Sequence, residues 1–208
     1  MIIPIEFQDV LRRRRMVRRY SPEPVDSAAV DRLLRNAVRA PQRRVSQGWA
    51  YLVLDQRADI ELFWEASTPP DRVARPDAWL RRMRTAPVII VPFSSKDAYL
   101  TRYAEEDKGW TDRDESRWAV PYWHVDAGMA SLLILLTAVD EGLGACFFGI
   151  PPGRDTALRT AFGVPSDFTP VGAITVGHPA PAERLQGSPA SRRRRPVQEV
   201  VHRGHWSR

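Results

Sequence analysis

Arginine is the residue type whose number and spacing in this sequence point most directly to chemistry. All but two of the 31 basic residues are arginines. Ten of these arginines form two runs, one at 12–15 continued by Arg18 and Arg19, and one at 192–195. A guanidinium group grips phosphate through a fixed fork of N–H donors. At a net charge of +6, the runs predict a phosphate-bearing cofactor, a nucleic-acid partner or simply a solvated basic surface.

Aromatic residues are concentrated between residues 94 and 123, where the sequence is otherwise polar and charged. Those that we consider as candidates for contact with a substrate are Tyr99, Tyr103, Trp110, Tyr122 and Trp123. Two interpretations remain open: packing within an irregular excursion, or an aromatic wall over a flat ligand. Acidic residues lie among the aromatics, and they argue against a nucleic-acid groove, which is usually of one sign.

The motifs of several common enzyme classes are absent. There is no Gly-x-Gly-x-x-Gly, no phosphate-binding Gly-x4-Gly-Lys-Ser/Thr loop and no Gly-x-Ser-x-Gly elbow. Cys146 is the one cysteine, so neither an internal disulfide nor a multi-cysteine zinc site is expected. His202 and His205 lack a third ligand nearby, and we predict no metal site. What remains favours a bound cofactor that carries the reactivity itself.

The hydrophobic pattern places these residues on alternating helices and strands. Helical spacing predicts helices at 5–19, 26–40, 58–66, 77–84, 125–141 and 156–162. Short apolar runs predict strands at 49–55, 87–93, 145–149 and 170–177. Residues 69–76 are expected to form a loop. The helix at 125–141 is apolar almost all round, so it must be buried centrally or against another subunit.

We therefore expect one domain over residues 1–208, with a substrate-covering excursion at 94–123 and a C-terminal arm at 180–208. The first ten residues lack the pattern of a signal peptide. No apolar stretch reaches the length of about 20 residues that spans a bilayer. The expected location is the cytoplasm, with no membrane partner.

Five segments, in order, resemble the nitroreductase-like FMN-dependent oxidoreductase family. They are Arg14-Arg-Met-Val-Arg-Arg-Tyr20 with the following Pro24-Val-Asp26, Ala40-Pro-Gln-Arg-Arg-Val-Ser-Gln-Gly-Trp49, Gly142-Leu-Gly-Ala-Cys-Phe-Phe-Gly149, Val176-Gly-His-Pro179, and the terminal Arg-Arg-Arg-Pro196 with Val200-Val-His202. The resemblance covers nearly the whole chain. It implies an α+β fold in which a central mixed sheet is flanked by helices, in an intertwined homodimer with FMN at the subunit boundary.

The resemblance also implies roles for individual residues. Arg14, with Arg192 or Arg194, would hold the FMN phosphate, and Arg18 would face N1 and O2 of the flavin. The backbone of Gly149 would face flavin N5, and that of Ile150 would face O4, so that no side chain acts as the catalyst. The remaining candidate cofactor contacts are Arg15, Met16, Pro41, Gln42, Arg43, Gln47, Arg82, Phe147 and Phe148, of which Pro41, Gln42 and Arg43 would reach across from the partner subunit.

Three residues depart from the family pattern. Met16 stands where the family usually has a phosphate-binding serine, and Arg15 is the expected replacement. Gln42 stands in place of a serine, and Gly48 in place of a common proline. These differences indicate a distinct subgroup, so substrate preference does not carry over from the family.

The function that the resemblance implies is NAD(P)H oxidation coupled to reduction of a nitroaromatic, quinone or enone-type acceptor by ping-pong hydride transfer. Two alternatives stay open. One is a flavoenzyme dedicated to a single biosynthetic redox step on a cofactor precursor or natural product. The other is a non-enzymatic basic module that binds nucleic acid or a nucleotide.

Overall fold

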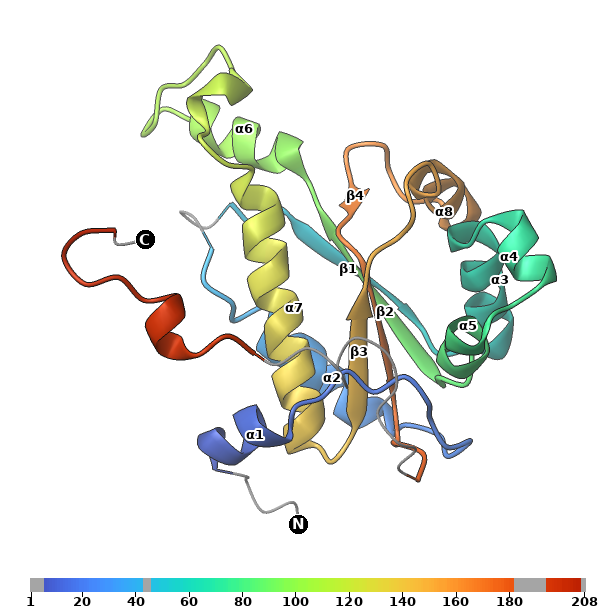
Figure 1. Cartoon of the computed structure of the whole chain (residues 1–208). Coiled ribbons are helices and arrows are strands. Elements are labelled where there is room, and N and C mark those ends of the chain that lie inside the picture. Colours follow the sequence, from blue (N-terminus) through green and yellow to red (C-terminus); the bar gives the residue numbers. More distant parts are fainter. Residues whose placement is uncertain (1–5, 43–45, 182–193, 207–208) are drawn as a thin grey trace.

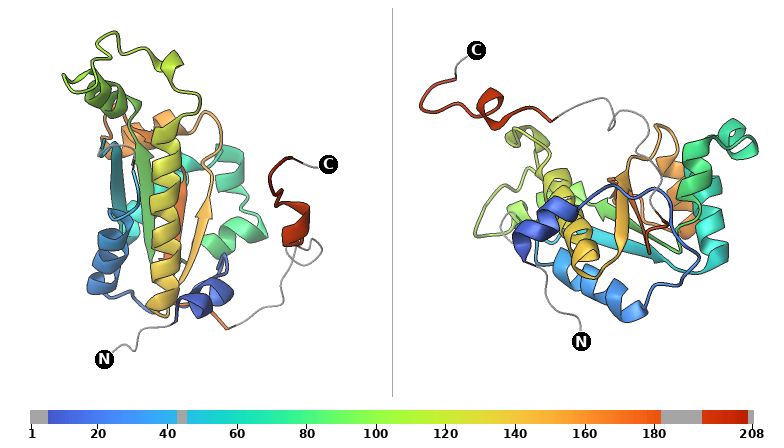
Figure 2. Two further views of the ribbon diagram at one scale, coloured as in Figure 1. Left: turned by 90° about the vertical axis from the view of Figure 1, so that its left-hand side faces the viewer. Right: turned by 60° about the horizontal axis from the view of Figure 1, so that its bottom comes forward.

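The computed structural model describes residues 6–42, 46–181 and 194–206. A central β-sheet lies between two groups of helices (Figure 1), as the two turned views also show (Figure 2). The α+β class and the helix-flanked sheet expected from the sequence are therefore confirmed.

The sheet has the strand order β1-β2-β5-β3, and the short strand β4 also pairs with β2. Its strands are β1 (Trp49–Leu54), β2 (Val88–Ser94), β3 (Gly144–Phe148), β4 (Thr169–Pro170) and β5 (Ala173–Gly177). Every pairing between these strands is antiparallel. The sequence resemblance implied a mixed sheet with both parallel and antiparallel strands. Among the described residues, the one parallel pairing is an isolated bridge between Met16 and Ala145. Strand β3 is thus an edge strand whose outer side is available to the N-terminal segment.

One face of the sheet is covered by α2 (Ser27–Ala37) and α7 (Tyr122–Asp140). Asp26 caps α2 by accepting a hydrogen bond from the Ala28 N–H at 3.1 Å. Leu33 of α2 and Ile134 of α7 are fully buried in the apolar cluster on this face. A bidentate ion pair between Arg32 and Glu141, at 2.6 and 2.7 Å, joins α2 to the end of α7.

The opposite face is covered by α3 (Arg57–Ser67), α4 (Pro70–Ala74), α5 (Ala78–Met83) and α8 (Asp155–Phe162). Strand β2 contributes side chains to the apolar clusters on both faces of the sheet, because alternate side chains of a strand point in opposite directions. Ile90 lies in the first cluster, whereas Ile89 and Phe93 lie in the second with Phe63 and Leu158.

Three of the expected elements differ from those observed. Helix α1 covers only Phe7–Arg13 instead of 5–19, because residues after Arg14 extend along the edge of β3 and exchange helical hydrogen bonds for contacts with that strand. The loop expected at 69–76 contains the short helix α4, with Pro70 in its first turn, where the missing N–H costs nothing. The strand expected at 170–177 is divided into the short β4 and the longer β5, and α6 lies in the excursion, where no helix was predicted. The other predicted helices and strands fall within a few residues of those observed.

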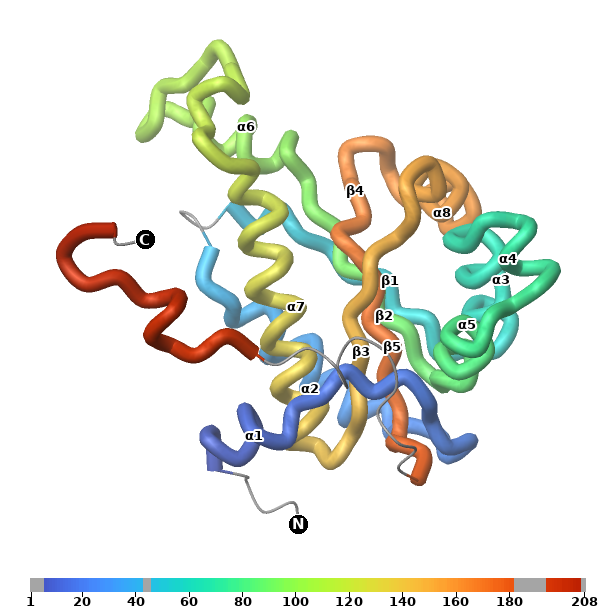
Figure 3. The backbone as a smooth tube through the Cα atoms, viewed as in Figure 1, coloured from blue at the N-terminus to red at the C-terminus, as the bar shows by residue number. Residues whose placement is uncertain are grey.

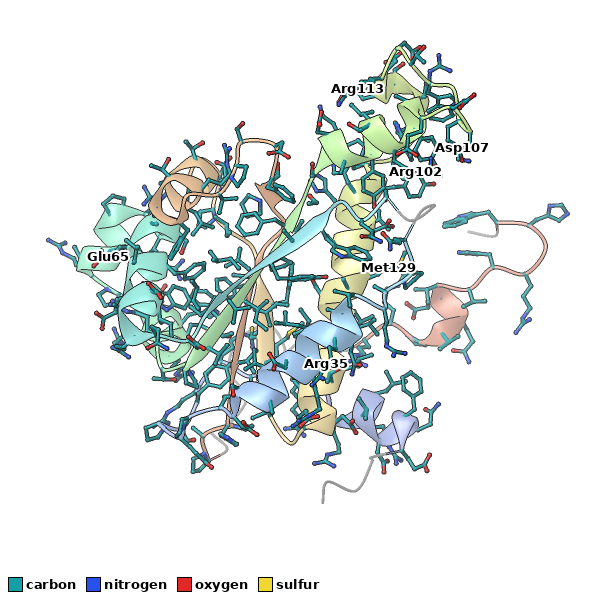
Figure 4. The ribbon with its side chains drawn as sticks, turned by 180° about the vertical axis from the view of Figure 1, so that it is seen from behind. Arg35, Glu65, Arg102, Asp107, Arg113 and Met129 are labelled. Atoms are coloured by element: carbon teal, nitrogen blue, oxygen red, sulfur yellow. The ribbon has the colours of Figure 1, made fainter. Side chains whose placement is uncertain are left out.

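Residues 94–123 form an excursion beyond the end of the sheet. It contains α6 (Lys96–Ala104) and the 3₁₀ turn η2 (Glu115–Arg117). Arg102, Asp107 and Arg113 gather in this excursion (Figure 4). Arg102 bonds Asp107 through two N–H groups, at 2.6 and 3.0 Å, and holds the pKa of that carboxyl well below its usual range.

The described part of the C-terminal arm, which contains η3 (Val197–Glu199), extends away from the sheet. Its exposed apolar side chains are Val197, Val200, Val201 and Trp206. Among the described helices, α7 alone has the length and apolar composition to cross a bilayer, and half of that stretch is buried within the molecule. Burial on this scale is what a core helix shows.

Candidate functional site

The arginine segment 14–18 lies against the outer edge of β3 (Figure 3). The Val17 N–H donates to the Ala145 carbonyl oxygen at 3.0 Å. Gly144 makes this approach possible, because a Cβ at that position would lie 2.7 Å from Cγ2 of Val17. The glycine thus explains how an extended chain can pack directly on the strand.

Tyr20 anchors the end of the same segment. Its hydroxyl donates to the Val17 carbonyl oxygen at 2.6 Å and lies 2.8 Å from the Thr175 hydroxyl. Its backbone N–H donates to the Thr85 hydroxyl at 2.9 Å, and that hydroxyl donates to the Arg82 carbonyl oxygen at 2.7 Å. The last turn of α5, which carries Arg82, is therefore tied to the arginine segment. The sequence analysis did not single out Thr85, since an isolated threonine gives no signal.

Arg14 is half-buried, and its Nη1 atom is shielded from solvent without a hydrogen-bond partner among the described residues. Such a donor is costly unless an acceptor reaches it. Two positions along the segment, the half-buried Met16 packs against both apolar clusters. The Met16 side chain therefore cannot replace the hydroxyl of the serine usual in the family. Arg15, next to it, is exposed.

Arg18 is half-buried beside Cys146 on β3. Burial raises the pKa of the Cys146 thiol, and the charge of Arg18 together with its hydrogen bond to the thiol opposes part of that rise. A thiol held in its neutral form in an apolar strand is a packing group.

The end of β3 opens toward solvent at Gly149, where an added Cβ would meet nothing within 4 Å. The two preceding phenylalanines point to opposite faces of the sheet. Phe147 packs against the α2–α7 cluster, and Phe148 stacks on Trp64 with ring centroids 5.5 Å apart. Packing on both sides fixes the backbone of Gly149 and Ile150, which is the backbone expected to face the flavin.

A polar group lies where β2 ends near the start of α7. Ser94 is buried, and its hydroxyl lies 2.8 Å from His124 Nδ1. Burial lowers the pKa of His124, so the neutral imidazole is favoured. His124 is therefore a polar residue in the first turn of α7. Ser94 was not identified from the sequence, because it lies at the end of an apolar strand without a pattern of its own.

The segment before β1 contains the exposed Pro41 and the half-buried Gln42. The Gln42 side-chain oxygen accepts a hydrogen bond from the Gln47 N–H at 2.7 Å. Gln47 has a φ of 45°, in the left-handed region that non-glycine residues rarely adopt. Arg43 lies outside the described residues, as does Arg192 of the C-terminal arm. Arg194 is exposed at the start of the described part of the arm.

The aromatic residues of the excursion form a cluster of their own. Tyr99 and Tyr103 are buried with Trp118 at its centre, whereas Trp110, Tyr122 and Trp123 are only partly buried around them. Neighbouring rings meet mainly edge to face, as Tyr103 and Trp118 do with centroids 4.5 Å apart. The structure thus brings all five candidate substrate residues together but leaves only the outer three accessible.

The model of the nitroreductase family matches residues 11–178 of the chain. The chain belongs to the nitroreductase family. This match spans the arginine segment, the whole sheet and the excursion, so the resemblance seen in the sequence motifs is confirmed.

Nitroreductase relatives match over most of their own length. A protein of Methanothermobacter thermautotrophicus, provisionally named NADH dehydrogenase/NAD(P)H nitroreductase, is 25% identical over 175 residues, which are 83% of this chain and 76% of the relative. A Desulfovibrio desulfuricans protein solved in complex with FMN and provisionally called a nitroreductase is 27% identical, with a TM-score of 0.67, and the match covers 99% of this chain and 100% of that one.

A nitroreductase family protein from Streptococcus pneumoniae has a TM-score of 0.72 at 20% identity, with 95% of this chain and 99% of that chain covered. At this identity the likeness concerns the fold. It supports the helix-flanked antiparallel sheet as the family architecture.

The residues present suit a phosphate-bearing flavin cofactor. The Nη1 of Arg14 is buried without a hydrogen-bond partner in the described part of the chain, and an anion would supply the acceptor. Gly149 leaves open space beside a fixed backbone at the end of β3, where a planar ring system could approach. Both features belong to one edge strand and the segment docked on it.

Proposed function

We propose that this protein is an FMN-dependent NAD(P)H oxidoreductase that reduces nitroaromatic, quinone or enone-type acceptors by ping-pong hydride transfer. Bound FMN would supply the redox chemistry, taking a hydride from NAD(P)H and passing it to the acceptor. The relative solved in complex with FMN supports this choice of cofactor. A cytoplasmic location, where NAD(P)H is available, accompanies the proposal.

The observation that carries the proposal is the solvent-shielded Nη1 atom of the half-buried Arg14. Its Nη1 has no partner among the described residues, and the segment that carries it is fixed along β3 by Val17 and Tyr20. A donor held in place without an acceptor is organised in advance for an anionic ligand. We assign it to the FMN phosphate, with Arg15 and Arg192 or Arg194 as additional cations.

The other candidate residues divide the remaining tasks. Arg18 would stabilise negative charge at the N1 and O2 end of the flavin, because a fixed cation lowers the free energy of charge that develops there. The backbone N–H groups of Gly149 and Ile150 would bond N5 and O4. Arg82, whose backbone carbonyl oxygen is linked through the Thr85 hydroxyl to the Tyr20 N–H, would add positive charge.

We assign the acceptor side to the accessible part of the aromatic cluster. Trp110, Tyr122 and Trp123 are partly buried and offer ring surface, whereas Tyr99 and Tyr103 support them from within. Flat conjugated acceptors fit such a surface through ring stacking. The dry surroundings of these rings would exclude water during hydride transfer.

A homodimer is part of the proposal, because apolar side chains are exposed on two neighbouring helices. Leu132 and Met129 of α7 are 49% and 41% exposed, and Phe7 and Leu11 of α1 are 61% and 41% exposed. Helices α1 and α7 contact each other. A second copy would bury this surface, and Pro41, Gln42 and Arg43 would then reach the flavin of the partner subunit, as the family resemblance implies.

The experiment that tests the cofactor assignment is a titration of the purified apoprotein with FMN, in which the quenching of flavin fluorescence measures binding. We expect saturable binding with one FMN per chain, weakened by added inorganic phosphate. Absence of binding by FMN, alongside binding by riboflavin without its phosphate, would contradict the role of the arginines. Turnover of NADH and NADPH with a quinone then tests the reaction.

A second candidate is a flavoenzyme dedicated to one biosynthetic acceptor. The observation that favours it is the bracing of the excursion, where ion pairs Lys96–Glu115 and Arg113–Asp97 join its first helix to its far end. A fixed cover admits fewer acceptors than a mobile one. Flavin reduction by NAD(P)H without reoxidation by any generic acceptor would favour this function.

A further inference from the structure

Gln42, one of the departures from the family pattern, has a structural partner within its own segment. Its side-chain oxygen accepts from the Gln47 N–H at 2.7 Å, and Gln47 is held at a φ of 45°. The shorter serine of the family pattern has no amide oxygen to make this bond. Gln42 therefore stabilises a backbone conformation that costs free energy by itself.

Gly48, a second departure, packs directly against the excursion. A Cβ at this position would lie 2.7 Å from Cε2 of Tyr99 and 2.9 Å from the Ser95 carbonyl oxygen. A proline carries a Cβ and would meet the same ring. The Ser95 N–H also donates to the Gly48 carbonyl oxygen at 2.7 Å. The Tyr99 ring thus occupies the space that a Cβ atom at position 48 would need, and the glycine at position 48 leaves that space to the ring.

Tyr99 is itself held firmly. It is 1% exposed, and its hydroxyl donates to the carboxylate of Asp126, which is 4% exposed on α7. Its ring meets Trp118 and Trp123 edge to face, at 5.9 and 6.1 Å between centroids. Burial, and after it the bond to Asp126, raises the pKa of Tyr99, so the phenol stays protonated and remains a donor.

We propose that Tyr99 is a positioning residue for the cofactor, fixed by Asp126 and acting through Gly48 on the backbone of Gln47 and the side chain of Gln42. This inference rests on the proposed function, in which Pro41 and Gln42 contact the flavin of the partner subunit. Tyr99 then does not touch the acceptor. Its ring couples the excursion, which covers the acceptor, to the segment that grips the cofactor.

Two single variants test this proposal. Tyr99→Phe keeps the ring and removes the hydrogen bond to Asp126, and Gly48→Ala places a Cβ against the ring. We expect the Kd for FMN to rise about fivefold in Tyr99→Phe, the effect of one lost buried hydrogen bond, and further in Gly48→Ala. At saturating FMN, the KM for the acceptor stays at the wild-type value in Tyr99→Phe, and the visible circular dichroism of bound flavin changes shape.

The control is Leu158→Ala, which leaves a cavity in α8 on the opposite face of the sheet. It should lower the Tm of the apoprotein and leave the Kd for FMN unchanged. The proposal is overturned if Tyr99→Phe and Gly48→Ala lower the Tm in the same way but bind FMN like the wild type. It is also overturned if Tyr99→Phe raises the acceptor KM with an unchanged Kd, since Tyr99 would then line the acceptor site.

These outcomes separate the inference from the proposed function. A wild-type chain that binds no FMN overturns the proposed function, and this inference with it. A wild-type chain that binds FMN, with variants that bind it equally well, overturns the inference alone.

Discussion

At the scale of single residues, Arg14 contributes in opposite directions to folding and to binding. Its Nη1 is buried without a hydrogen-bond partner among the described residues. Leaving a donor in this state costs free energy in the apoprotein, and an anion that accepts its hydrogen bond recovers it. In the proposed function, the FMN phosphate is that anion.

Arg14→Leu should therefore raise the Tm of the apoprotein slightly while it weakens FMN binding. Loss of a hydrogen bond to a charged group costs about 1.5–3 kcal/mol, so the Kd should rise by roughly 10- to 100-fold. Thermal unfolding of the apoprotein and a fluorescence titration check the two effects. Arg13→Leu, at the exposed neighbouring position in α1, is the control and should leave the Kd near the wild-type value. An equal loss in both variants would point to a general charge effect.

His124 should make stability depend on pH in a defined window. Burial lowers its pKa in the folded state, whereas in the unfolded chain the value returns to about 6.5. The unfolded state then binds more protons below neutral pH, so the free energy of unfolding falls as the pH drops from about 7 toward the folded-state pKa. In the His124→Gln variant, the free energy of unfolding should fall less steeply over this pH range, because the titrating imidazole is absent. Urea unfolding of both proteins at a series of pH values measures it, and parallel declines would exclude His124 as the cause.

At the scale of elements, the decisive contact is the one between β3 and the extended segment that follows α1. The antiparallel pairing with β5 leaves the outer edge of β3 free, and the Val17 N–H bonds it. An edge strand needs such a cover. The same cover brings Arg14 and Arg18 beside the strand whose end presents Gly149.

Gly144→Ala should disrupt this docking. Its new Cβ would lie within 2.7–2.9 Å of three Val17 atoms, and such overpacking costs about 1–3 kcal/mol. Both the Tm and the affinity for FMN should fall. Adding Val17→Ala removes two of the three crowding atoms and should recover part of each loss. A double variant no better than Gly144→Ala alone would show that the contact with Val17 is not the cause.

At the scale of the whole molecule, the proposed homodimer would bury the exposed apolar surface of α1 and α7. Leu132→Glu places a charge on this surface and should convert a dimer to a monomer that binds FMN poorly. Sedimentation equilibrium and an FMN titration measure the two outcomes. Leu62→Glu is the matched control, because Leu62 is 38% exposed on α3 at the other side of the sheet. A Leu132→Glu protein that stays dimeric would place the interface elsewhere.

The sequence predicted the elements better than their connections. Apolar runs are sufficient to locate strands such as β2, since all seven of its residues are buried. Helix α1 was predicted too long, because the hydrogen bond of Val17 to β3 competes with the helix and depends on tertiary contact. The strand order, and with it the antiparallel pairing, likewise depends on contacts between distant residues that no local pattern contains.

The sequence could predict those residues of the candidate site that belong to a recognisable motif. The arginine runs were evident from their number and spacing, and the family resemblance added their role and that of Gly149. The structure docks the arginine segment on the edge strand β3, which ends just before Gly149. The roles of Gln42 and Gly48 were not predictable, because the Tyr99 ring that fills the space at Gly48 comes from the excursion about 50 residues later in the chain. A departure from a motif gains a meaning only when its spatial neighbour is known.

The central claim is that this chain binds FMN and uses it to accept hydride from NAD(P)H. The most direct test is an anaerobic titration of the FMN-loaded protein with NADH and, separately, NADPH, followed by its visible absorption. The account predicts that at least one donor bleaches the flavin bands and that a quinone or nitroaromatic added afterwards restores them. Protein that cannot be loaded with FMN, or bound FMN that neither donor reduces, would contradict it.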